Sequence, residues 1–575
     1  MVPFREVWSC DTEFQAGAGE KPFVLCLVAR ELYTQREIRL WRDDLIELTA
    51  APFNVGDDAL FVAFFASAEL GCFLQLGWPL PINVVDLYAE HRVSTNGLKL
   101  PDGNSLLGVL ARHGLAHMES TEKHSKRDLI LGQSSWTAEE IAEILHYCAA
   151  DVTGTEVLLK RMQEELDWPR ALWRGRYSAA IASMEHCGVP VDLGLYNQLV
   201  DHWDALKLGL VRTIDADYGI YEGTTFKEAN FAAWLSRNGI PWPRNQSGHL
   251  LLDKDTFKDR ANAWPIVAPL RELRRTLGMM RLTDLEVGSD GRNRTLLSPF
   301  GTVTGRNTPS NSKFIFGAAK WLRGLVQPPP GYGIVYLDWS AQEFALAAAL
   351  SGDERMLADY AAGDPHLEFA KTARLVPPDA TKATHPVMRE RCKQTNLGVL
   401  YGMRARGLAY RLGMTAADAE ELLRMHKGAY RRYWAWSDAM VPTALMRREI
   451  HTAFGWRMIT SRHTKNGTLM NWPMQSHASD MMRGAAVAAT ESGLAIAAPI
   501  HDAFLLLAPL GALDADADAM RGIMEVASEV VTDGVRVRVD TLTIRYPDRY
   551  PGNGEMWDIA MKELESCIAQ TLKAA

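Results

Sequence analysis

A short apolar segment that ends in an aspartate constrains the fold of this chain more than any other stretch. Residues 334–340 read IVYLDWS and follow the loop PPPGYG at 328–333, which predicts a buried strand. Residues 498–507, APIHDAFLLL, have the same form. A carboxylate at the end of a buried strand is costly unless it meets a cation. We therefore expect Asp338 and Asp502 to hold two metal ions, which suits phosphoryl transfer, and two salt-bridged core aspartates are the alternative.

The bulk properties predict a multidomain protein of a reducing compartment. A length of 575 residues implies several domains, and the seven scattered cysteines form no CxxC pair, which argues against disulfides and zinc. The start MVPFREVW lacks a signal-peptide pattern, and the apolar stretch 59–66 is too short to span a membrane. We expect a cytoplasmic protein with no membrane partner. The net charge of −8 means that any nucleic-acid surface must be local.

Four of the acidic residues in the first 151 residues, together with one tyrosine, are candidate site residues. Residues 7–14, VWSCDTEF, predict a strand that presents two acids on one face. A glutamate then begins an apolar segment, and a capping box at 137–140 opens a helix on which a tyrosine and an aspartate lie one turn apart. Each piece alone is explained by ordinary surface or helix-end chemistry. The residues are Asp11, Glu13, Glu69, Tyr147 and Asp151.

Residues 389–402, RERCKQTNLGVLYG, form the most specific helix that the sequence predicts. Every fourth residue lies on one ridge about 18 Å long at ~1.5 Å per residue, cationic at one end and apolar at the other. Cations can grip phosphate, and the apolar end can pack on a base. A core helix with a snorkelling lysine is the alternative. The ridge consists of Arg389, Lys393, Leu397 and Tyr401.

Two further groups of polar residues could contact nucleic acid. Asn471 and Gln475, in NWPMQSHASD, carry amides that can read base edges. A basic cluster in the largely helical region 195–285 is either a solvated helix face or a contact to a duplex backbone. The cluster consists of Arg271, Arg274, Arg275 and Arg281.

Taken in order, these motifs resemble two known families. The N-terminal pattern, Asp-x-Glu, a later acid and Tyr-x-x-x-Asp, resembles the proofreading 3′-5′ exonucleases of the RNase H-like class, with Glu69 where that family has Asp. Residues 170–575 are similar to the family A (DNA polymerase I-type) DNA polymerases. The signatures are DWSAQE at 338–343, the helix at 389–402 and HDA at 501–503. The departures are Leu397 for Phe or Tyr, Ala503 for Glu and Trp339 for Tyr.

The resemblance implies an α/β multidomain fold. An RNase H-like exonuclease domain would span residues 1–168 and a right-hand polymerase domain residues 169–575. Because the exonuclease motif begins at residue 11, we expect the family's separate 5′-nuclease domain to be absent. Within the polymerase domain the expected parts are a thumb at about 185–300, a palm at about 301–350 and 468–575, and fingers at about 351–467.

The resemblance also implies a role for each motif residue. Two Mg²⁺ ions would be held by Asp338 and Asp502, and two more by Asp11, Glu13, Glu69 and Asp151, with Mn²⁺ able to substitute and Tyr147 orienting water. Arg389 and Lys393 would hold the dNTP triphosphate, Leu397 would lie near the sugar, and Tyr401 at the templating base. Glu343 would exclude a 2′-hydroxyl. The residues expected at the terminal base pair are Arg306, Asn471, Gln475 and His501.

The implied activity is template-directed DNA synthesis on a primer–template, with proofreading, by a monomeric replicative enzyme of phage or prophage type in a bacterial host cytoplasm. Replisome or processivity factors are the expected further partners. Four alternatives stay open: an inactive exonuclease domain, a stand-alone exonuclease with an inert scaffold, a related RNA polymerase, and a non-catalytic remnant. Glu343 and the exonuclease acids count against the RNA polymerase, and the retention of Asp338 and Asp502 counts against the remnant.

Overall fold

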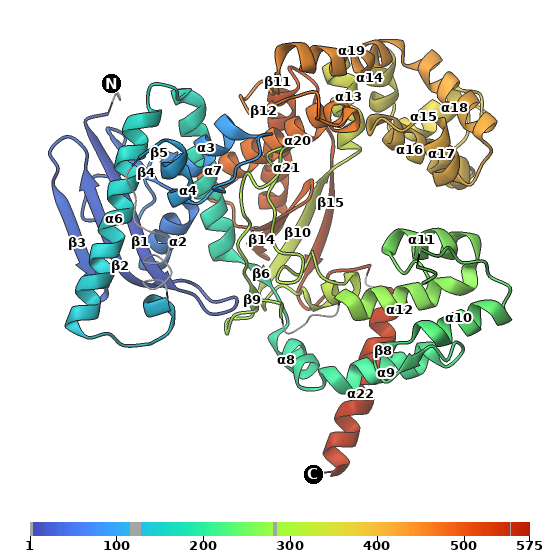
Figure 1. The fold of residues 1–575 in the computed structure, drawn as a ribbon, viewed down its shortest axis with the longest axis horizontal. Coiled ribbons are helices and arrows are strands. Elements are labelled where there is room, and N and C mark those ends of the chain that lie inside the picture. Colours follow the sequence, from blue (N-terminus) through green and yellow to red (C-terminus); the bar gives the residue numbers. More distant parts are fainter. Residues whose placement is uncertain (1–3, 116–127, 246, 280–283, 553, 575) are drawn as a thin grey trace.

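The computed structural model describes residues 4–115, 128–245, 247–279, 284–552 and 554–574. Two sheets organise the chain, one in the N-terminal part and one at the centre of the molecule, and two groups of helices project from the central sheet (Figure 1). Within the described residues, no helix combines the length and the apolar character needed to cross a membrane.

The N-terminal sheet has the strand order β3-β2-β1-β4-β5. β1, β2 and β3 pair antiparallel, whereas β4 and β5 continue the sheet in parallel from β1. Its strands are β1 (Glu6–Gln15), β2 (Phe23–Glu31), β3 (Glu37–Trp41), β4 (Ala59–Ala63) and β5 (Val84–Asp86). Its helices are α1 (Arg42–Leu45), α2 (Ser67–Leu76), α3 (Leu87–Thr95), α4 (Leu106–Arg112) and α6 (Ala138–Met162).

Alternation along the strands gives this sheet two buried faces. Trp8 and Cys10 point into a core shared with α2, while Cys26 and Val28 point into a core shared with α6. The predicted capping box at the start of α6 is present, because Thr137 and Glu140 bond each other's backbone amides. The sheet is therefore covered by helices on both sides, and β1 lies in its middle.

Helix α7 (Trp168–Cys187) joins the two parts of the molecule. It begins at the predicted limit between the two domains, residues 168 and 169, and continues beyond it without a break. The Asp167 side chain caps the helix and Pro169 stands in its first turn, where a proline fits because the amide there has no helical partner. The same helix packs on α2 and β5 and, further along, on α20 (Asn466–Glu491) and β13 (Ile496–Ile500). The domain limits themselves remain predictions.

The central sheet has the order β13-β14-β10-β15, with β10 (Tyr332–Trp339), β14 (Ala503–Pro509) and β15 (Val539–Arg545) all antiparallel. The expected strand at 334–340 is confirmed as part of β10. The second expected strand, 498–507, is instead a hairpin, because His501 and Asp502 form the turn between β13 and β14. The backbone at His501 is left-handed (φ 54°), and the sequence has no glycine at this position that would indicate a turn.

The two faces of β10 differ. Val335, Leu337 and Trp339 point into the core formed with α20 and α21 (Leu513–Val531), where the Trp339 indole donates to the carbonyl of Met524. By alternation Tyr336 and Asp338 point to the opposite face. The sheet thus presents Asp338 away from its main helical layer.

Two helical arms stand on the same side of the central sheet (Figure 1). We call residues 193–279 the lower arm and residues 354–447 the upper arm. The lower arm contains α8 (Leu193–Asp201), α9 (Trp203–Asp215), β7 (Tyr221–Glu222), β8 (Thr225–Phe226), α10 (Glu228–Arg237), α11 (Lys254–Ala263), η1 (Pro265–Val267) and α12 (Ala268–Met279). The upper arm contains α14 (Glu354–Ala361), α15 (Pro365–Thr372), α16 (Pro386–Leu400), α17 (Ala405–Leu412), α18 (Ala416–Ala429) and α19 (Arg431–Arg447).

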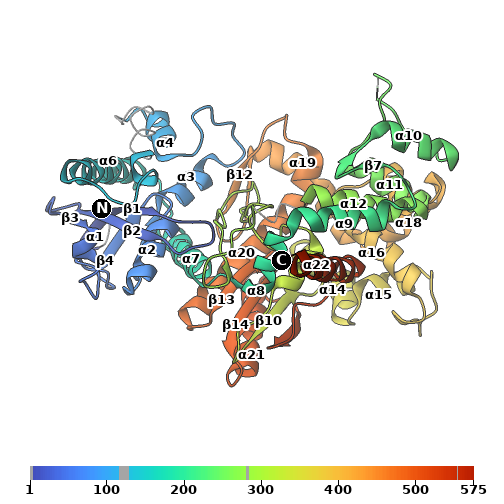
Figure 2. The ribbon, with the colours of Figure 1, turned by 90° about the horizontal axis from the view of Figure 1, so that it is seen from below.

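The remaining elements connect these parts. Helix α13 (Gln342–Ser351) follows β10, and the C-terminal helix α22 (Glu555–Ala574) packs along α9 (Figure 2). The short elements are β6 (Val189–Pro190), β9 (Arg292–Asn293), η3 (Lys320–Leu325), β11 (Glu449–His451) and β12 (Arg457–Ile459). One hydrogen bond, from the Tyr410 hydroxyl of α17 to the Asp259 carboxylate of α11, spans the two arms.

Candidate active sites

Three carboxylates meet on one face of the N-terminal sheet. Asp11 and Glu13 project from β1 and Asp151 from α6, and one oxygen of each lies within 4.8 Å of the others. α6 is seated on β1 by two contacts, Ser9 Oγ to the carbonyl of Val152 at 3.2 Å and Cys148 Sγ to the carbonyl of Asp11 at 3.3 Å. Three carboxylates so close together fit a hard divalent cation.

Glu69 is near this group but not part of it. It lies in the first turn of α2, only 4% exposed, and the cluster of three acids does not include it. Burial, together with the charges of Asp11, Asp86 and Asp151, raises the pKa of Glu69 well above its ordinary value. The structure therefore brings together three of the four predicted acids and leaves Glu69 as a buried neighbour.

Tyr147 lies one helical turn from Asp151, as the sequence predicted. Burial and the Asp151 carboxylate, to which its hydroxyl is hydrogen-bonded, raise the pKa of Tyr147. The phenol therefore stays protonated and can donate a hydrogen bond next to the three acids. Asp86, by contrast, caps α3 through the Tyr88 amide and accepts from the Ser178 hydroxyl, so its hydrogen bonds are structural.

The second site lies at one end of the central sheet. Asp338 is the penultimate residue of β10, and Asp502 stands in the adjoining β13–β14 turn. Burial, Asp502 and Asp540 raise the pKa of Asp338 to about 6, in that order of effect. No hydrogen bond or ion pair to the Asp338 carboxylate is found among the described parts of the chain. Two acids held this close, one of them without a partner, fit a cation-binding site.

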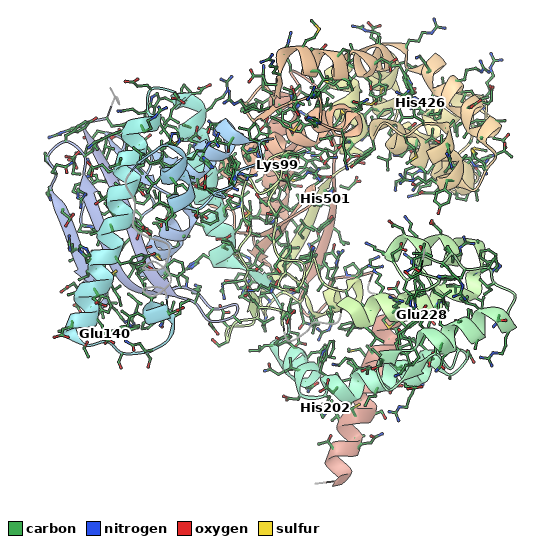
Figure 3. The ribbon with its side chains drawn as sticks, in the orientation of Figure 1. Lys99, Glu140, His202, Glu228, His426 and His501 are labelled. Atoms are coloured by element: carbon green, nitrogen blue, oxygen red, sulfur yellow. The ribbon has the colours of Figure 1, made fainter. Side chains whose placement is uncertain are left out.

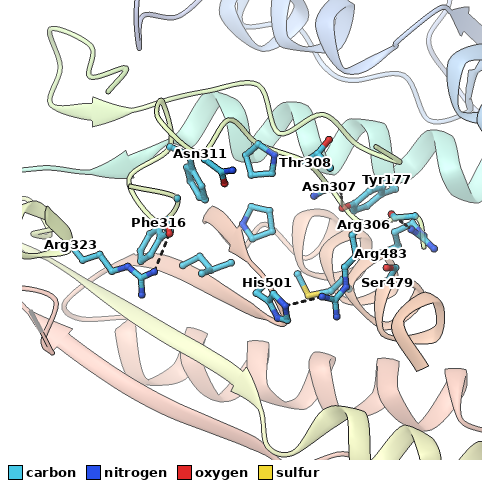
Figure 4. A pocket seen from close by; sticks show the side chains of 17 residues that line it. Tyr177, Arg306, Asn307, Thr308, Asn311, Phe316, Arg323, Ser479, Arg483 and His501 are labelled. Atoms are coloured by element: carbon cyan, nitrogen blue, oxygen red, sulfur yellow. Dashed lines mark hydrogen bonds between the residues drawn. The ribbon is translucent and has the colours of Figure 1, made fainter. Parts of the chain in front are cut away.

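Asp502 is held by an arginine and a histidine side chain. Arg306 Nη2 donates to Asp502 Oδ1 at 2.6 Å, and His501 Nδ1 lies 2.7 Å from Asp502 Oδ2. Arg306 Nη1 and His501 Nε2 are 2.9 Å apart, and Figure 4 shows the two side chains facing each other. His501 itself lies near the middle of the molecule (Figure 3). A guanidinium thus occupies one side of this carboxylate.

Arg306 is positioned by a buried support. The Arg483 guanidinium, 1% exposed, donates to the carbonyl of Gly305 at 2.8 Å and pairs with Asp480 at 2.5 Å. Gly305 has φ +77°, and a side chain there would lie 3.0 Å from Arg483 and from the Trp456 ring. The turn that carries Arg306 is therefore fixed by packing.

A pocket of about 520 Å³ contains both aspartates and much of the predicted ridge. Lys393 lines it and has no ion pair among the residues that the structure describes. Arg389 is occupied, because its Nε donates to Asp364 at 2.8 Å. The ridge residues in the wall are Lys393, Leu397 and Tyr401, beside Asp338, Glu343 and Asp502.

Glu343, Tyr401 and Gln475 form one hydrogen-bonded group in and beside this wall. The Tyr401 hydroxyl donates to Glu343 Oε1 at 2.8 Å, and the Gln475 amide donates to that hydroxyl at 3.1 Å and to the same carboxylate. Burial and Glu343 raise the pKa of Tyr401. The sequence predicted separate roles for these residues, whereas the structure joins them. Asn471 lies one turn earlier on α20 and is 9% exposed.

A groove of about 540 Å³ adjoins the pocket at His501. Its walls include Arg306, Asn307 and Arg323, and Arg323 turns towards the carbonyl of Phe316 (Figure 4). A groove that carries cationic and amide side chains and leads to two acids is suited to a polyanion.

The basic cluster on α12 does not behave as one surface. The Arg274 guanidinium lies 4.7 Å from the ring centroids of both Phe226 and Phe257, and burial lowers its pKa. The DNA contact of Arg274 stays a prediction, and in the structure its side chain packs on two rings inside the lower arm. Arg275 pairs with Glu272 at 3.6 Å, Arg271 is half-buried, and Arg281 lies outside the described residues.

Sequence reasoning missed two residues at this site. Arg411 on α17 lines the pocket and donates from Nε to Gln394 at 2.7 Å, which places a second cation beside Lys393. Asp540 on β15 lies directly opposite Asp338 in the register of β10 and β15. Neither has a local motif. Only the packing of α17 on the predicted ridge and the register of β15 could have identified them.

The chain is similar to known DNA polymerases. Residues 265–543 match the family described as DNA polymerase family A. DNA polymerase I of Thermus caldophilus is 26% identical over 405 residues (64% of this chain and 47% of that protein), and that of Chloroflexus aurantiacus is 25% identical over 433 residues (68% and 45%). That of Aquifex aeolicus is 23% identical over 412 residues (66% and 70%). The chain thus spans about half the length of the Thermus and Chloroflexus relatives.

A solved structure shares the fold. It is described as the POL domain of Pol1 from M. smegmatis in complex with DNA primer-template and dNTP, and it aligns with a TM-score of 0.71 at 18% identity. The alignment covers 94% of this chain and 95% of the other, so the shared fold extends into the N-terminal sheet.

Proposed function

We propose that the protein adds dNTPs to a primer 3′ end as a template directs, because residues 265–543 match the family described as DNA polymerase family A. The observation that carries the proposal is the pocket at the end of the central sheet. Its lining includes Asp338, Asp502 and Lys393, together with Glu343 and Tyr401. The lower arm would be the thumb, the upper arm the fingers and the central sheet the palm.

Asp338 and Asp502 would hold two divalent ions. The chemistry that bound Mg²⁺ supplies is activation of the attacking oxygen and neutralisation of the leaving oxygen. Asp502 has first to exchange its contact with Arg306, whose guanidinium is then free to enter the groove next to His501. Lys393 would bind the triphosphate and offset the charge that develops on the leaving pyrophosphate.

Glu343 would act as the sugar gate. Its carboxylate is fixed by Tyr401 and Gln475, so it cannot turn aside to admit a 2′-hydroxyl without breaking two hydrogen bonds. Shortening it in Glu343→Ala should raise the ratio of ribonucleotide to deoxynucleotide incorporation. An unchanged ratio would remove Glu343 from this role.

We further propose that the N-terminal part is a 3′-5′ proofreading exonuclease of the RNase H-like class. The sheet order, three antiparallel strands followed by two parallel ones, supports this assignment, as does the cluster of Asp11, Glu13 and Asp151 beside Tyr147. Glu69, one methylene longer than the family's Asp, would complete the site by turning towards Asp11. A phage or prophage origin, a replicative role, monomeric action and further replisome partners remain predictions.

Primer extension tests the polymerase proposal. The wild-type chain, given Mg²⁺, a primer–template and four dNTPs, should extend the primer, and Asp338→Asn should extend it several orders of magnitude more slowly. Asp11→Asn should extend normally, because its carboxylate lies in the other cluster. Extension by Asp338→Asn at the wild-type rate would overturn the assignment.

Digestion of a single-stranded 3′ end without dNTPs tests the exonuclease proposal. Wild type and Asp338→Asn should degrade the strand, and Asp11→Asn should not. If wild type is inert and Glu69→Asp restores cleavage, the domain is a proofreader disabled by one methylene. Degradation without extension would favour a stand-alone exonuclease.

A further inference from the structure

Asp338 has an acidic neighbour on only one of the two strands beside it. The central strand pairs Asp338 directly with Ala503 on β14 and with Asp540 on β15. Residues directly opposite in an antiparallel pair point to the same face, with Cβ atoms about 5 Å apart. Asp540 therefore stands beside Asp338 on the pocket face, on the side opposite the small side chain of Ala503.

Within the described residues, no ion pair explains the presence of Asp540. Asp540 is exposed, and within the described ranges it has no ion pair or side-chain hydrogen bond. Arg538, two residues earlier on the same face, directs its guanidinium to the carbonyls of Tyr360 and Gly363. Asp338 is equally unpaired, whereas Asp502 has Arg306 and His501.

A structural reason for an acid at position 540 is lacking. Aspartate is unfavourable in strands, and like charges directly opposite each other destabilise a sheet. The neighbouring Thr541 and Thr543 are the kind of residue that suits a half-exposed strand. An acid that costs stability at this place is explained if a cation binds between it and Asp338.

The Arg306 contact is an independent sign that the region attracts cations. A guanidinium already lies 2.6 Å from Asp502, which stands in the β13–β14 turn, on the other side of β10 from β15. Asp338 and Asp540 have no such counter-ion. A cation that binds at Asp338 would therefore meet in Asp540 an acid with no counter-ion to displace.

We propose that Asp540 is a metal-binding residue of the polymerase site and supplies the third carboxylate that position 503 lacks. The inference rests on the proposed function. Its oxygens would bind the cation directly or through a coordinated water, as is common for Mg²⁺, which keeps several waters. The acid would have moved from one neighbour of Asp338 to the other, so that the charge of the site is kept.

Mn²⁺ binding tests this in the full chain. We would measure the Mn²⁺ dissociation constant by electron paramagnetic resonance in an Asp11→Asn background, which weakens the N-terminal cluster. Asp540→Asn, similar in size, should bind roughly tenfold more weakly, within the range for groups that support a metal's direct ligands. Asp540→Glu should retain the affinity. Asp548→Asn, an exposed acid just beyond β15, is the matched control and should change nothing.

A rescue variant makes the test specific. Ala503→Glu combined with Asp540→Asn should restore Mn²⁺ affinity, because it returns a carboxylate to the other side of Asp338. Unchanged Mn²⁺ affinity in Asp540→Asn would overturn the inference, as would a weakening that Ala503→Glu does not reverse. Primer extension is measured separately. Its absence in every variant would refute the proposed polymerase activity and leave the Mn²⁺ series to decide the role of Asp540.

Discussion

Asp502 is bound to the Arg306 guanidinium, which a metal ion at that carboxylate has to displace. The Arg306 guanidinium competes with metal for Asp502 Oδ1. We therefore predict that Arg306→Ala binds Mn²⁺ roughly fivefold more tightly, since a hydrogen bond to a charged group contributes about 1.5–3 kcal/mol before screening by solvent. The same variant should extend primers more slowly, because the groove loses a cation. Arg323→Ala, in the same groove but remote from Asp502, is the control; equal Mn²⁺ affinity in both would contradict the competition.

Lys393 and Arg389 are both predicted to bind the triphosphate, and their contacts in the structure differ. Lys393 faces the pocket without an ion pair among the described side chains, whereas Arg389 is bound to Asp364. We predict that Lys393→Ala raises the KM for dNTP by about tenfold or more and lowers kcat, while Arg389→Ala has the smaller effect. Steady-state kinetics at saturating primer–template measure both. The reverse ranking, or a loss of DNA affinity in Lys393→Ala with KM unchanged, would refute it.

The ionisation of Asp338 predicts a pH dependence. Its pKa is raised to about 6, and only the ionised carboxylate binds a metal ion. Below pH 6 the ionised fraction falls, by roughly fivefold between pH 6 and pH 5. Mn²⁺ affinity in the Asp11→Asn background should fall by the same factor over that interval and change little above pH 7. A flat profile from pH 5 to pH 7 would contradict the assignment.

Helix α7 offers a direct comparison of a buried and an exposed ion pair. Arg174 makes two hydrogen bonds to Glu90 at 2.6 and 2.8 Å, with both side chains almost fully buried. Arg176 pairs with Glu491 on the surface. Removing one partner of a buried pair leaves an uncompensated charge, so Glu90→Ala should lower the free energy of unfolding by about 3–5 kcal/mol. Glu491→Ala should lower it by at most about 1 kcal/mol. Denaturant unfolding measures both variants, and an equal loss of unfolding free energy in the two would contradict this prediction.

Elements with a strong local signal could be predicted from the sequence. Alternation identified β1, and the capping box placed the start of α6 at the correct residue. The recurrence of the ridge residues at every fourth position predicted α16, on which Lys393 and Leu397 line the same pocket. In these cases the residues that specify the element are adjacent in the chain, so no tertiary knowledge is needed.

The features that depend on packing could not be predicted in this way. The turn at His501 and Asp502 contains neither glycine nor proline, so the hairpin looked like one strand. Arg274 looked like a surface cation because its ring partners lie on β8 and α11. Asp540 follows the alternating run VRVRV and belongs to no sequence motif. Its relation to Asp338 exists only through the register of β15.

At the scale of the whole molecule, the two clusters of acids are held by one framework. The N-terminal cluster is fixed to β1 and α6, the central one to β10 and the β13–β14 turn, and α7 packs against both sheets. Asn96, after α3, donates to the carbonyls of Val303 and Arg457 and adds a second bridge. We therefore predict that the chain unfolds in a single thermal transition when followed by calorimetry. Two separate transitions would show that the halves are independent.

The continuity of α7 also bears on how a copying error would be corrected. α7 is one continuous helix that packs on elements of both sheets, and we expect it to hold the two clusters of acids at a fixed separation. Under the proposed function, the primer end would then have to move between the two clusters of acids, and this movement requires base pairs at that end to melt. Discrimination between a matched and a mismatched primer end would then depend on how easily the end of the duplex melts, because α7 fixes the distance that the strand has to cross.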